Sequence, residues 1–192
     1  MKKIIITAAI LIATIATVNA QAVWGLRLGA SMPTLVSSEG DVEGVDGKFG
    51  VEVGPVLYYS LGEFLYLNSS LSFSMKAFED ISTTWLELPV NLGYIMNFND
   101  LSFYAQAGPY IGYKLSEKID GKKEDFKLFS DITAGLGVMV GMNIQRFKIE
   151  IGYQYGVTNI WGKDVENLFK LIGAEKPVSH LNSFFLGVSY VF

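Results

Sequence analysis

The sequence predicts an all-β fold, an eight-stranded antiparallel up-and-down transmembrane β-barrel. Three observations lead to this prediction. Apolar and polar residues alternate along eight segments, the connections between the segments are short and long in turn, and the glycines of the segments share one phase of the alternation. The composition agrees, because 14% aromatic residues and 20 glycines among 192 residues are typical of a β-rich chain with close backbone packing.

The N-terminus has the pattern of a secretory signal peptide. Two lysines precede an apolar run at residues 4–18, and the small residues that follow predict cleavage after Ala20 or Ala22. The alternative is a retained N-terminal anchor helix. We expect residues 1–20 to be removed and residues 21–192 to form the barrel domain.

Charge and composition exclude several functions. Removing residues 1–20 removes two lysines, so the formal net charge changes from -4 to -6, which argues against nucleic acid as a partner. The chain has no cysteine, which excludes disulfides, thiolate metal sites and a cysteine nucleophile, and it has a single histidine. We therefore predict no metal site and no cofactor. Beyond the signal peptide no apolar run reaches the ~18 residues of a membrane helix, so a membrane-embedded chain must form a closed barrel.

The predicted strands are near or above the ~9–11 residues that a tilted strand needs to cross a bilayer. They cover residues 23–32, 48–60, 64–76, 83–96, 101–114, 131–144, 147–156 and 183–192. The short connections are residues 61–63, 97–100 and 145–146, and the long ones are residues 33–47, 77–82, 115–130 and 157–182. This rhythm is typical of a bacterial barrel with both termini in the periplasm.

The two faces of the strands differ in chemistry. One phase is apolar and free of charge, as in Leu26, Leu28, Val138 and Val140. The other phase holds the charged residues, many serines and the strand glycines. A soluble barrel would expose the polar face, but glycine on a wet surface would weaken the strands, whereas inside a narrow barrel it relieves crowding. The polar face is therefore predicted to be the lumen, and the apolar face to contact lipid.

Aromatic residues gather near the strand ends, which predicts two interfacial girdles. The first, toward the short connections, contains Trp24, Tyr59, Tyr66, Tyr94, Phe98, Phe103, Phe147 and Phe192. The second, toward the long loops, contains Phe49, Phe73, Phe78, Trp85, Tyr113, Tyr155 and Phe184.

Four motifs carry a family resemblance: "LELPVNLGY" (86–94), "YAQAGPYIGY" (104–113), "GYQYGVTNI" (152–160) and the terminal "LGVSYVF" (186–192). They resemble the small outer-membrane β-barrel proteins of Gram-negative bacteria known as the porin family. The resemblance covers the mature chain and implies a bacterial outer-membrane location with outer-membrane lipids around the barrel. It also implies that the last strand is the signal read by the barrel-assembly machinery, through Leu186, Val188, Tyr190 and Phe192.

The lumen charges are the first candidate site. They are Arg27, Glu52, Glu87, Lys114, Asp131 and Glu150. Arg27 is expected to be the counter-charge for the three glutamates. One interpretation is a structural network that plugs the barrel, because unpaired buried charge is unfavourable. The other is a constriction for ions or solutes. We favour the plug, since eight strands leave room for little more than side chains.

The long last loop holds two further candidates. His180, with Ser179, Ser183 and Glu175, suggests an outer-membrane lipid-modifying enzyme of the lipid A deacylase kind, but no fixed strand spacing links these residues. We expect no catalytic residue and no enzyme. A short helix capped by Asp164 is predicted to end at Gly173. Its apolar face, made of Val165, Leu168, Phe169 and Ile172, would either pack on the barrel rim or form an extracellular docking element.

The acidic first loop could attract divalent cations, although its spacing does not match an EF-hand and a solvated loop is favoured. The function predicted overall is an outer-membrane barrel with a structural, surface-interaction or narrow-pore role. The extracellular ligand is not identified.

Overall fold

The computed structural model describes residues 22–37, 45–78, 81–98, 101–119, 128–171 and 178–192. The predicted signal peptide, most of the acidic first loop, and residues 172 and 175 of the last loop lie outside the described residues.

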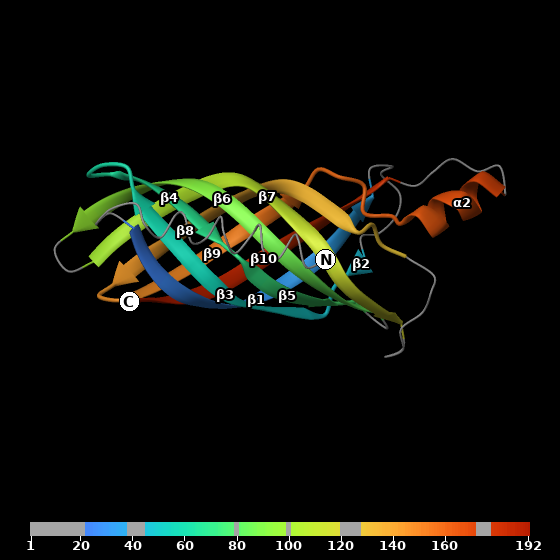
Figure 1. Cartoon of the computed structure of the whole chain (residues 1–192), viewed down its shortest axis with the longest axis horizontal. Coiled ribbons are helices and arrows are strands. Elements are labelled where there is room, and N and C mark those ends of the chain that lie inside the picture. The colour runs from blue at the N-terminus through green and yellow to red at the C-terminus, as the bar shows by residue number, and fades with distance from the viewer. Residues whose placement is uncertain (1–21, 38–44, 79–80, 99–100, 120–127, 172–177) are drawn as a thin grey trace, which may run out of the picture.

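Eight strands form a closed antiparallel ring, which confirms the predicted fold class (Figure 1). The strands are β1 (Ala22–Ser37), β3 (Phe49–Ser60), β4 (Leu65–Ser70) with β5 (Ser72–Ala77), β6 (Ile81–Phe98), β7 (Leu101–Ile119), β8 (Ile132–Ile144), β9 (Phe147–Gly156) and β10 (Ser179–Val191). β1 pairs with both β3 and β10 and so closes the ring. β2 (Val45–Asp46) adds a short pairing to β1, and α2 (Lys163–Leu171) follows β9.

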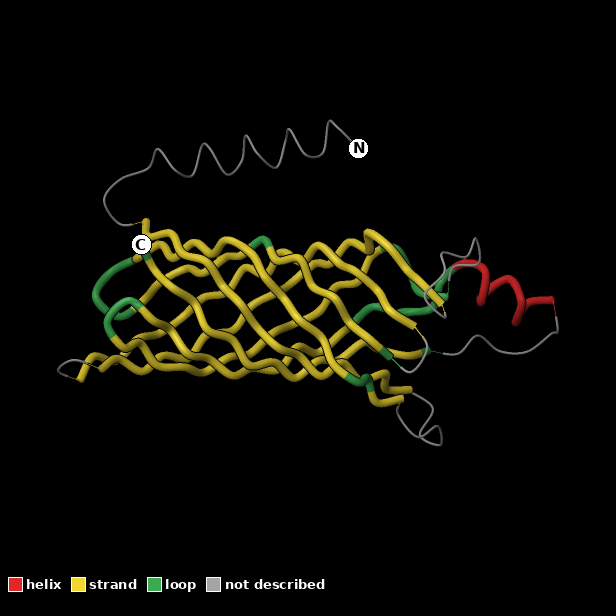
Figure 2. The backbone as a smooth tube through the Cα atoms, turned by 90° about the horizontal axis from the view of Figure 1, so that it is seen from below, coloured by secondary structure: helices red, strands yellow, loops and turns green. Residues whose placement is uncertain are grey.

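The barrel has two unlike ends (Figure 2). At one, called the turn end, lie the short connections, the start of β1 and the end of β10, where the Phe192 N–H donates to the Trp24 carbonyl at 2.9 Å. At the other, called the loop end, lie β2, α2 and the described parts of the long connections.

The strand predicted at residues 64–76 is interrupted at Leu71 and becomes β4 and β5. By register, Leu71 lies opposite Pro55 of β3, and Ser70 lies opposite Pro89 of β6. Proline has no N–H to donate to a ladder. The break therefore occurs where two prolines remove donors from both sides of the same strand.

Three strands extend four or five residues further toward the loop end than predicted. β1 ends at Ser37 instead of residue 32, β7 ends at Ile119 instead of residue 114, and β10 begins at Ser179 instead of residue 183. The pairing of β1 with β10 continues to Ser37 opposite Ser179. An apolar outward face is required only within the membrane, so hydropathy does not reveal the parts of strands beyond it.

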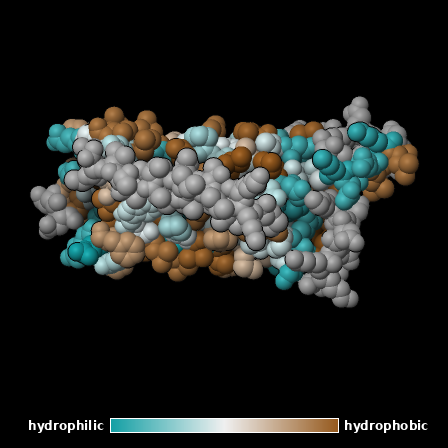
Figure 3. All heavy atoms as spheres, in the orientation of Figure 1, coloured by the Kyte–Doolittle hydropathy of each residue, from teal (hydrophilic) through white to brown (hydrophobic). Residues whose placement is uncertain are grey.

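The predicted assignment of the two faces is confirmed by burial. Inward Arg27 and Glu87 are 2% and 1% exposed, whereas outward Leu28 and Val138 are 63% and 56% exposed. Apolar residues are prominent along the barrel body, and hydrophilic residues gather toward its ends (Figure 3). Within the described part of the chain, no helix has the length and apolar character needed to cross a membrane.

Inward glycines leave room for inward aromatic rings. A Cβ atom at Gly93 would collide with the Tyr66 ring, and one at Gly152 would collide with the Phe185 ring. At both positions an aromatic ring packs so close to the backbone that only glycine fits, as the sequence predicts for a crowded lumen.

Candidate functional site

Arg27 and Glu150 form an ion pair in the middle of the barrel interior. The two residues lie on β1 and β9, the strands on either side of β10, and Arg27 Nη2 donates to Glu150 Oε1. Both side chains are almost fully buried, at 2% and 1% exposure. The guanidinium carbon also lies 5.3 Å from the ring centroid of Phe185 on β10.

The second oxygen of Glu150 is bound from a third strand. The Tyr104 hydroxyl donates to Oε2 at 2.9 Å, and Gln106 Nε2 lies 3.3 Å from the same oxygen. Both donors belong to β7, which is opposite β1 in the ring. This carboxylate therefore connects two opposite walls of the barrel through the lumen.

A second buried ion pair joins Lys76 of β5 to Glu87 of β6, with Lys76 Nζ 2.5 Å from Glu87 Oε1. The expectation that Arg27 neutralises Glu87 is therefore wrong. Lys76 is missing from the predicted network because the predicted strand ended at that residue. Lys76 alternates in step with the inward residues Ser72 and Ser74 of β5, and this pattern in the sequence could have placed it in the lumen.

The third inward carboxylate, Glu52, has no ion pair of comparable geometry among the described residues. It is 7% exposed, and its Oε1 makes no hydrogen bond with the described residues. Glu52 lines a cavity of about 10 Å³ together with Arg27 and Glu87. A water molecule needs roughly 10–15 Å³. The space between the ion pairs therefore admits about one water.

Toward the turn end, Lys148 is held by three tyrosine rings. Its Nζ lies 4.3, 4.8 and 5.7 Å from the ring centroids of Tyr58, Tyr104 and Tyr66, and it donates to Asn143 Oδ1 at 2.8 Å. Ammonium groups are attracted to the faces of aromatic rings at such distances. The sequence places Lys148 in the lumen phase but does not predict this cage, because the three tyrosines come from three other strands.

Toward the loop end, the interior is filled by an apolar cluster, which we call the loop-end cluster. Its buried members are Leu35, Phe78, Trp85, Phe129, Ile160 and Leu181. Phe78 and Trp85 were predicted in the outer girdle, and this prediction is wrong, since they are 4% and 1% exposed. Trp85 shares the inward phase of Glu87, and its Nε1 donates to Thr83 Oγ1 at 2.8 Å.

Lys114 and Asp131 do not contact the two ion pairs in the middle of the lumen, Arg27–Glu150 and Lys76–Glu87. Lys114 Nζ lies 2.5 Å from Glu117 Oε2 and 3.7 Å from Asp131 Oδ1, and it also donates to the Phe129 carbonyl. Glu117 in turn accepts the Leu128 N–H at 3.0 Å. This group fixes the end of the loop after β7 and thereby holds Phe129 in the loop-end cluster.

Comparison with known proteins identifies the family. The profile described as the outer membrane protein beta-barrel domain matches residues 19–162. The chain belongs to this family. Among solved structures, Neisserial surface protein A aligns with a TM-score of 0.56 at 15% identity, covering 88% of this chain and 97% of that one. The attachment invasion locus protein Ail of Yersinia pestis aligns with a TM-score of 0.48 at 15% identity, covering 90% and 99%.

The alignment with Neisserial surface protein A, at 15% identity, shows a shared fold and no more. No curated protein matches the sequence significantly. In this outer-membrane barrel the apolar side chains of the strands lie on the exposed outer face.

The histidine candidate lies at the loop end of the outer-membrane barrel. His180 Nδ1 is 3.3 Å from the Thr158 carbonyl oxygen, and its ring stacks near Tyr155. The Ser179 hydroxyl accepts a hydrogen bond from Trp161 Nε1 at 3.1 Å. Neither contact is the hydroxyl-to-imidazole bond that a serine nucleophile needs. Glu175, the expected acid, lies outside the described residues.

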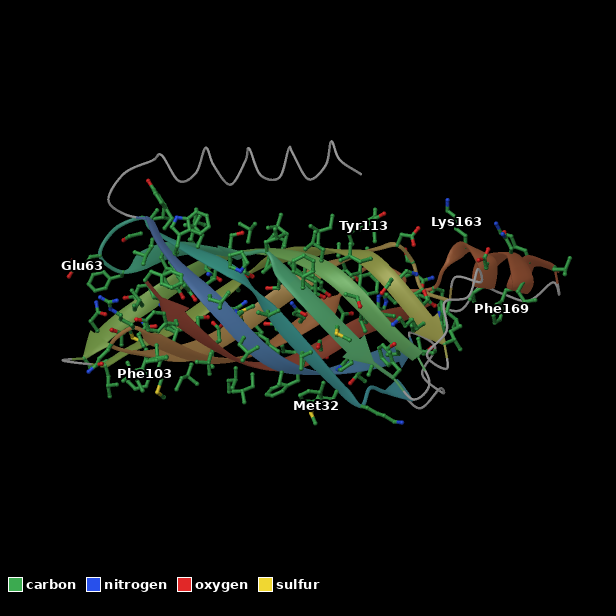
Figure 4. The ribbon with its side chains drawn as sticks, turned by 60° about the horizontal axis from the view of Figure 1, so that its bottom comes forward. Met32, Glu63, Phe103, Tyr113, Lys163 and Phe169 are labelled. Atoms are coloured by element: carbon green, nitrogen blue, oxygen red, sulfur yellow. The ribbon has the colours of Figure 1, made fainter. Side chains whose placement is uncertain are left out.

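The loop helix α2 extends beyond the loop end of the barrel (Figure 4). It begins at Lys163, one residue before the predicted cap Asp164. Of its predicted apolar face, Val165 is 7% exposed, whereas Leu168 is 50% exposed. Packing on the rim therefore does not bury the whole face, and the position of Ile172 is not described.

The residues of the predicted assembly signal point outward from β10. Leu186, Val188 and Tyr190 are 49%, 43% and 37% exposed, and Phe192 follows the strand at 72%. They form an apolar row on the outer side of the barrel, as the alternation predicts.

Proposed function

We propose that this outer-membrane barrel has a closed lumen, anchors its loop-end surface at the outside of the cell, and catalyses no reaction. The observation that carries the proposal is the filling of the lumen at three successive levels. The Lys148 cage lies toward the turn end, the two ion pairs lie in the middle, and the loop-end cluster lies toward the long loops.

The level of the ion pairs and the level of the loop-end cluster each oppose the passage of ions or solutes. The cavity of about 10 Å³ between the ion pairs is far too small for a hydrated ion. An ion crossing the loop-end cluster would lose its water next to Trp85 and Phe129 without gaining polar partners, and such desolvation is strongly unfavourable. An eight-stranded ring of this width leaves little room for these side chains to move aside.

The loop end supplies the surface that the barrel would display. In barrels with short turns on one side and long loops on the other, the long loops are extracellular. α2 then projects outside the cell, with Leu168 and Leu171 exposed at 50% and 84%. Loops on a rigid scaffold often carry binding functions, so this surface is the proposed place for an extracellular partner.

The barrel-assembly machinery is the proposed partner during insertion. The support comes from β10, which supplies the last edge of the ring and carries an outward apolar row that ends at Phe192. Recognition of this strand and closure of the ring would then use the same segment.

Solute permeation tests the closed lumen. Purified protein is reconstituted into liposomes, and swelling in isotonic solutions of small sugars is followed by light scattering, with a general porin as the positive control. We expect the swelling rate of protein-free liposomes. A rate that increases with the amount of protein would overturn the proposal.

Lipid turnover tests the absence of catalysis. The refolded barrel is incubated with lipid A and with phospholipid, and released acyl chains are measured. We expect none above the background of heat-denatured protein. Sustained release that His180→Ala abolishes would instead establish the lipid-modifying alternative.

A further inference from the structure

A cavity of about 300 Å³ lies inside the barrel at the turn end, and we call it the turn-end vestibule. Six strands contribute residues of the inward phase to its lining, namely Val23 of β1, Tyr58 of β3, Tyr66 of β4, Ile95 of β6, Lys148 of β9 and Val191 of β10. Because these strands surround most of the ring, the cavity is the mouth of the lumen and lies between the Lys148 cage and the rim. Its volume is at the lower end of the roughly 300–1,000 Å³ that is usual for small-molecule sites.

The walls of the turn-end vestibule are mostly apolar. Ile95 and Val191 pack against the buried cluster that contains the three tyrosines of the Lys148 cage. Val23 is 38% exposed, so the walls are reached from the solvent at the turn end. Walls of this kind favour a ligand with a hydrocarbon body, because the transfer of that body from water onto apolar side chains is favourable.

A positive charge lies at the inner end of the turn-end vestibule, and no carboxylate neutralises it. Lys148 is part of the lining, and no carboxylate of the described residues forms an ion pair with its Nζ. Glu150, two residues further along β9, is bound by Arg27 and by two donors of β7. The tyrosine rings and Asn143 stabilise the ammonium group, but these partners are neutral.

Among the described residues, Glu63 is the second charged member of the lining. It lies in the connection between β3 and β4 and is exposed at the rim (Figure 4). Water and salt screen an exposed charge far more than a partly buried one. The electrostatic field inside the turn-end vestibule is therefore dominated by Lys148.

We infer that the turn-end vestibule binds a small carboxylate with an apolar body, whose carboxylate group accepts a hydrogen bond from Lys148 Nζ. An ammonium group has three N–H donors, and Asn143 accepts from one of them, so donors remain for an anion. Hydrogen bonds between charged groups are about twice as strong as those between neutral groups. The apolar body of the ligand contacts Val23, Ile95 and Val191. Binding takes place from the turn end and requires neither a closed lumen nor the proposed orientation in the membrane.

Two substitutions change the turn-end vestibule, and two matched substitutions change the barrel elsewhere. Lys148→Met removes the charge but keeps a side chain of similar length, and Val23→Phe fills the apolar part. The controls are Lys118→Met, at an exposed lysine near the loop end, and Val53→Phe, at an outward valine of β3 that is 45% exposed. Heat-modifiable mobility in gels confirms folding of each variant.

Fluorine NMR measures binding to the refolded proteins in micelles of an uncharged detergent. The probes are 4-fluorophenylacetate and its neutral analogue 4-fluorophenylacetamide, and protein-free micelles give the background of partitioning. We expect the wild type and both controls to bind the acid at least about tenfold more tightly than the amide, the contribution of one hydrogen bond between charged groups. Lys148→Met should lose this preference, and Val23→Phe should weaken the binding of both probes.

Equal binding of the acid and the amide by the wild type would overturn the inference, and this comparison does not depend on any variant. An unchanged preference in Lys148→Met would also overturn it, because another group would then hold the carboxylate. Inorganic phosphate tests the apolar part of the assignment. Phosphate at the same concentration should leave the bound acid in place, whereas full displacement would show a general anion site and contradict the assigned ligand class.

Discussion

Arg27 and Glu150 are separated in the ring by β10, yet their side chains meet inside the barrel and both are almost fully buried. Tyr104 and Gln106 bind the other oxygen of the carboxylate from the opposite wall. Removing one member of a buried ion pair leaves an uncompensated charge, which is more unfavourable than removing both. The pair is therefore the most sensitive point of the central lumen.

Arg27→Ala should lower the free energy of unfolding by about 3–5 kcal/mol, because Glu150 keeps its burial but loses its ion partner. Urea unfolding of the refolded protein in lipid vesicles, followed by tryptophan fluorescence, measures the change. Exposed Lys118→Ala is the control and should change stability by less than about 0.5 kcal/mol. Adding Glu150→Gln to Arg27→Ala should restore part of the loss. Equal stability of Arg27→Ala and the control would contradict the role of the pair.

Lys76→Met should destabilise the barrel through Glu87 in the same way, and Glu87→Gln should suppress much of the effect. A double-mutant cycle on these two residues should give a coupling energy of at least about 1 kcal/mol, since the groups are in contact. A coupling near zero would show that another group neutralises Glu87.

Gly93→Ala should lower stability by about 1–3 kcal/mol, because the new methyl group collides with the Tyr66 ring in a packed lumen. Gly62→Ala is the matched control, since no atom lies within 4 Å of a Cβ at that position. The same unfolding assay compares the two. If both variants unfold alike, the lumen has space beside Gly93 and is less filled than the structure indicates.

The sequence predicts the ring and the direction of its side chains because both follow from period-two alternation. An inward position is recognised from its neighbours two residues away, as for Arg27 and Glu87. The same rule also places Trp85 inside, but its aromatic character and its position near a strand end suggested the interfacial girdle. Parity was the stronger signal, because Thr83, Trp85 and Glu87 keep one inward phase along β6 although the pairing with β7 shifts register between Thr84 and Trp85.

The partners inside the lumen could not be predicted in the same way. Which glutamate meets Arg27 depends on strand stagger, and the alternation does not report stagger. Long side chains make the ion partner harder to predict, because they reach past the residue that lies directly opposite. Lys76 lies opposite Thr83 of β6 in register, yet its Nζ binds Glu87. The loop-end cluster was missed because Phe129 and Ile160 belong to connections, which have no periodic pattern.

Deleting Tyr190–Phe192 should prevent delivery of the protein to the outer membrane. The deletion removes the end of the outward apolar row and the bond from the Phe192 N–H to the Trp24 carbonyl. The amount of heat-modifiable protein in outer-membrane fractions measures delivery, and conservative Phe192→Tyr serves as the control. Refolding of the deleted protein in detergent separates loss of recognition from loss of folding. Normal abundance in the membrane after the deletion would contradict the proposed signal.

Single-channel recording in planar lipid bilayers tests the closed lumen most directly. The wild-type protein, with folding confirmed beforehand, is compared with Trp85→Ala/Phe129→Ala, which empties the loop-end cluster, and with a general porin in the same bilayers. We expect no stable conductance step for the wild type, and at most small, irregular steps for the double variant, which keeps the two central ion pairs. Reproducible porin-sized steps from the wild-type protein would contradict the closed lumen.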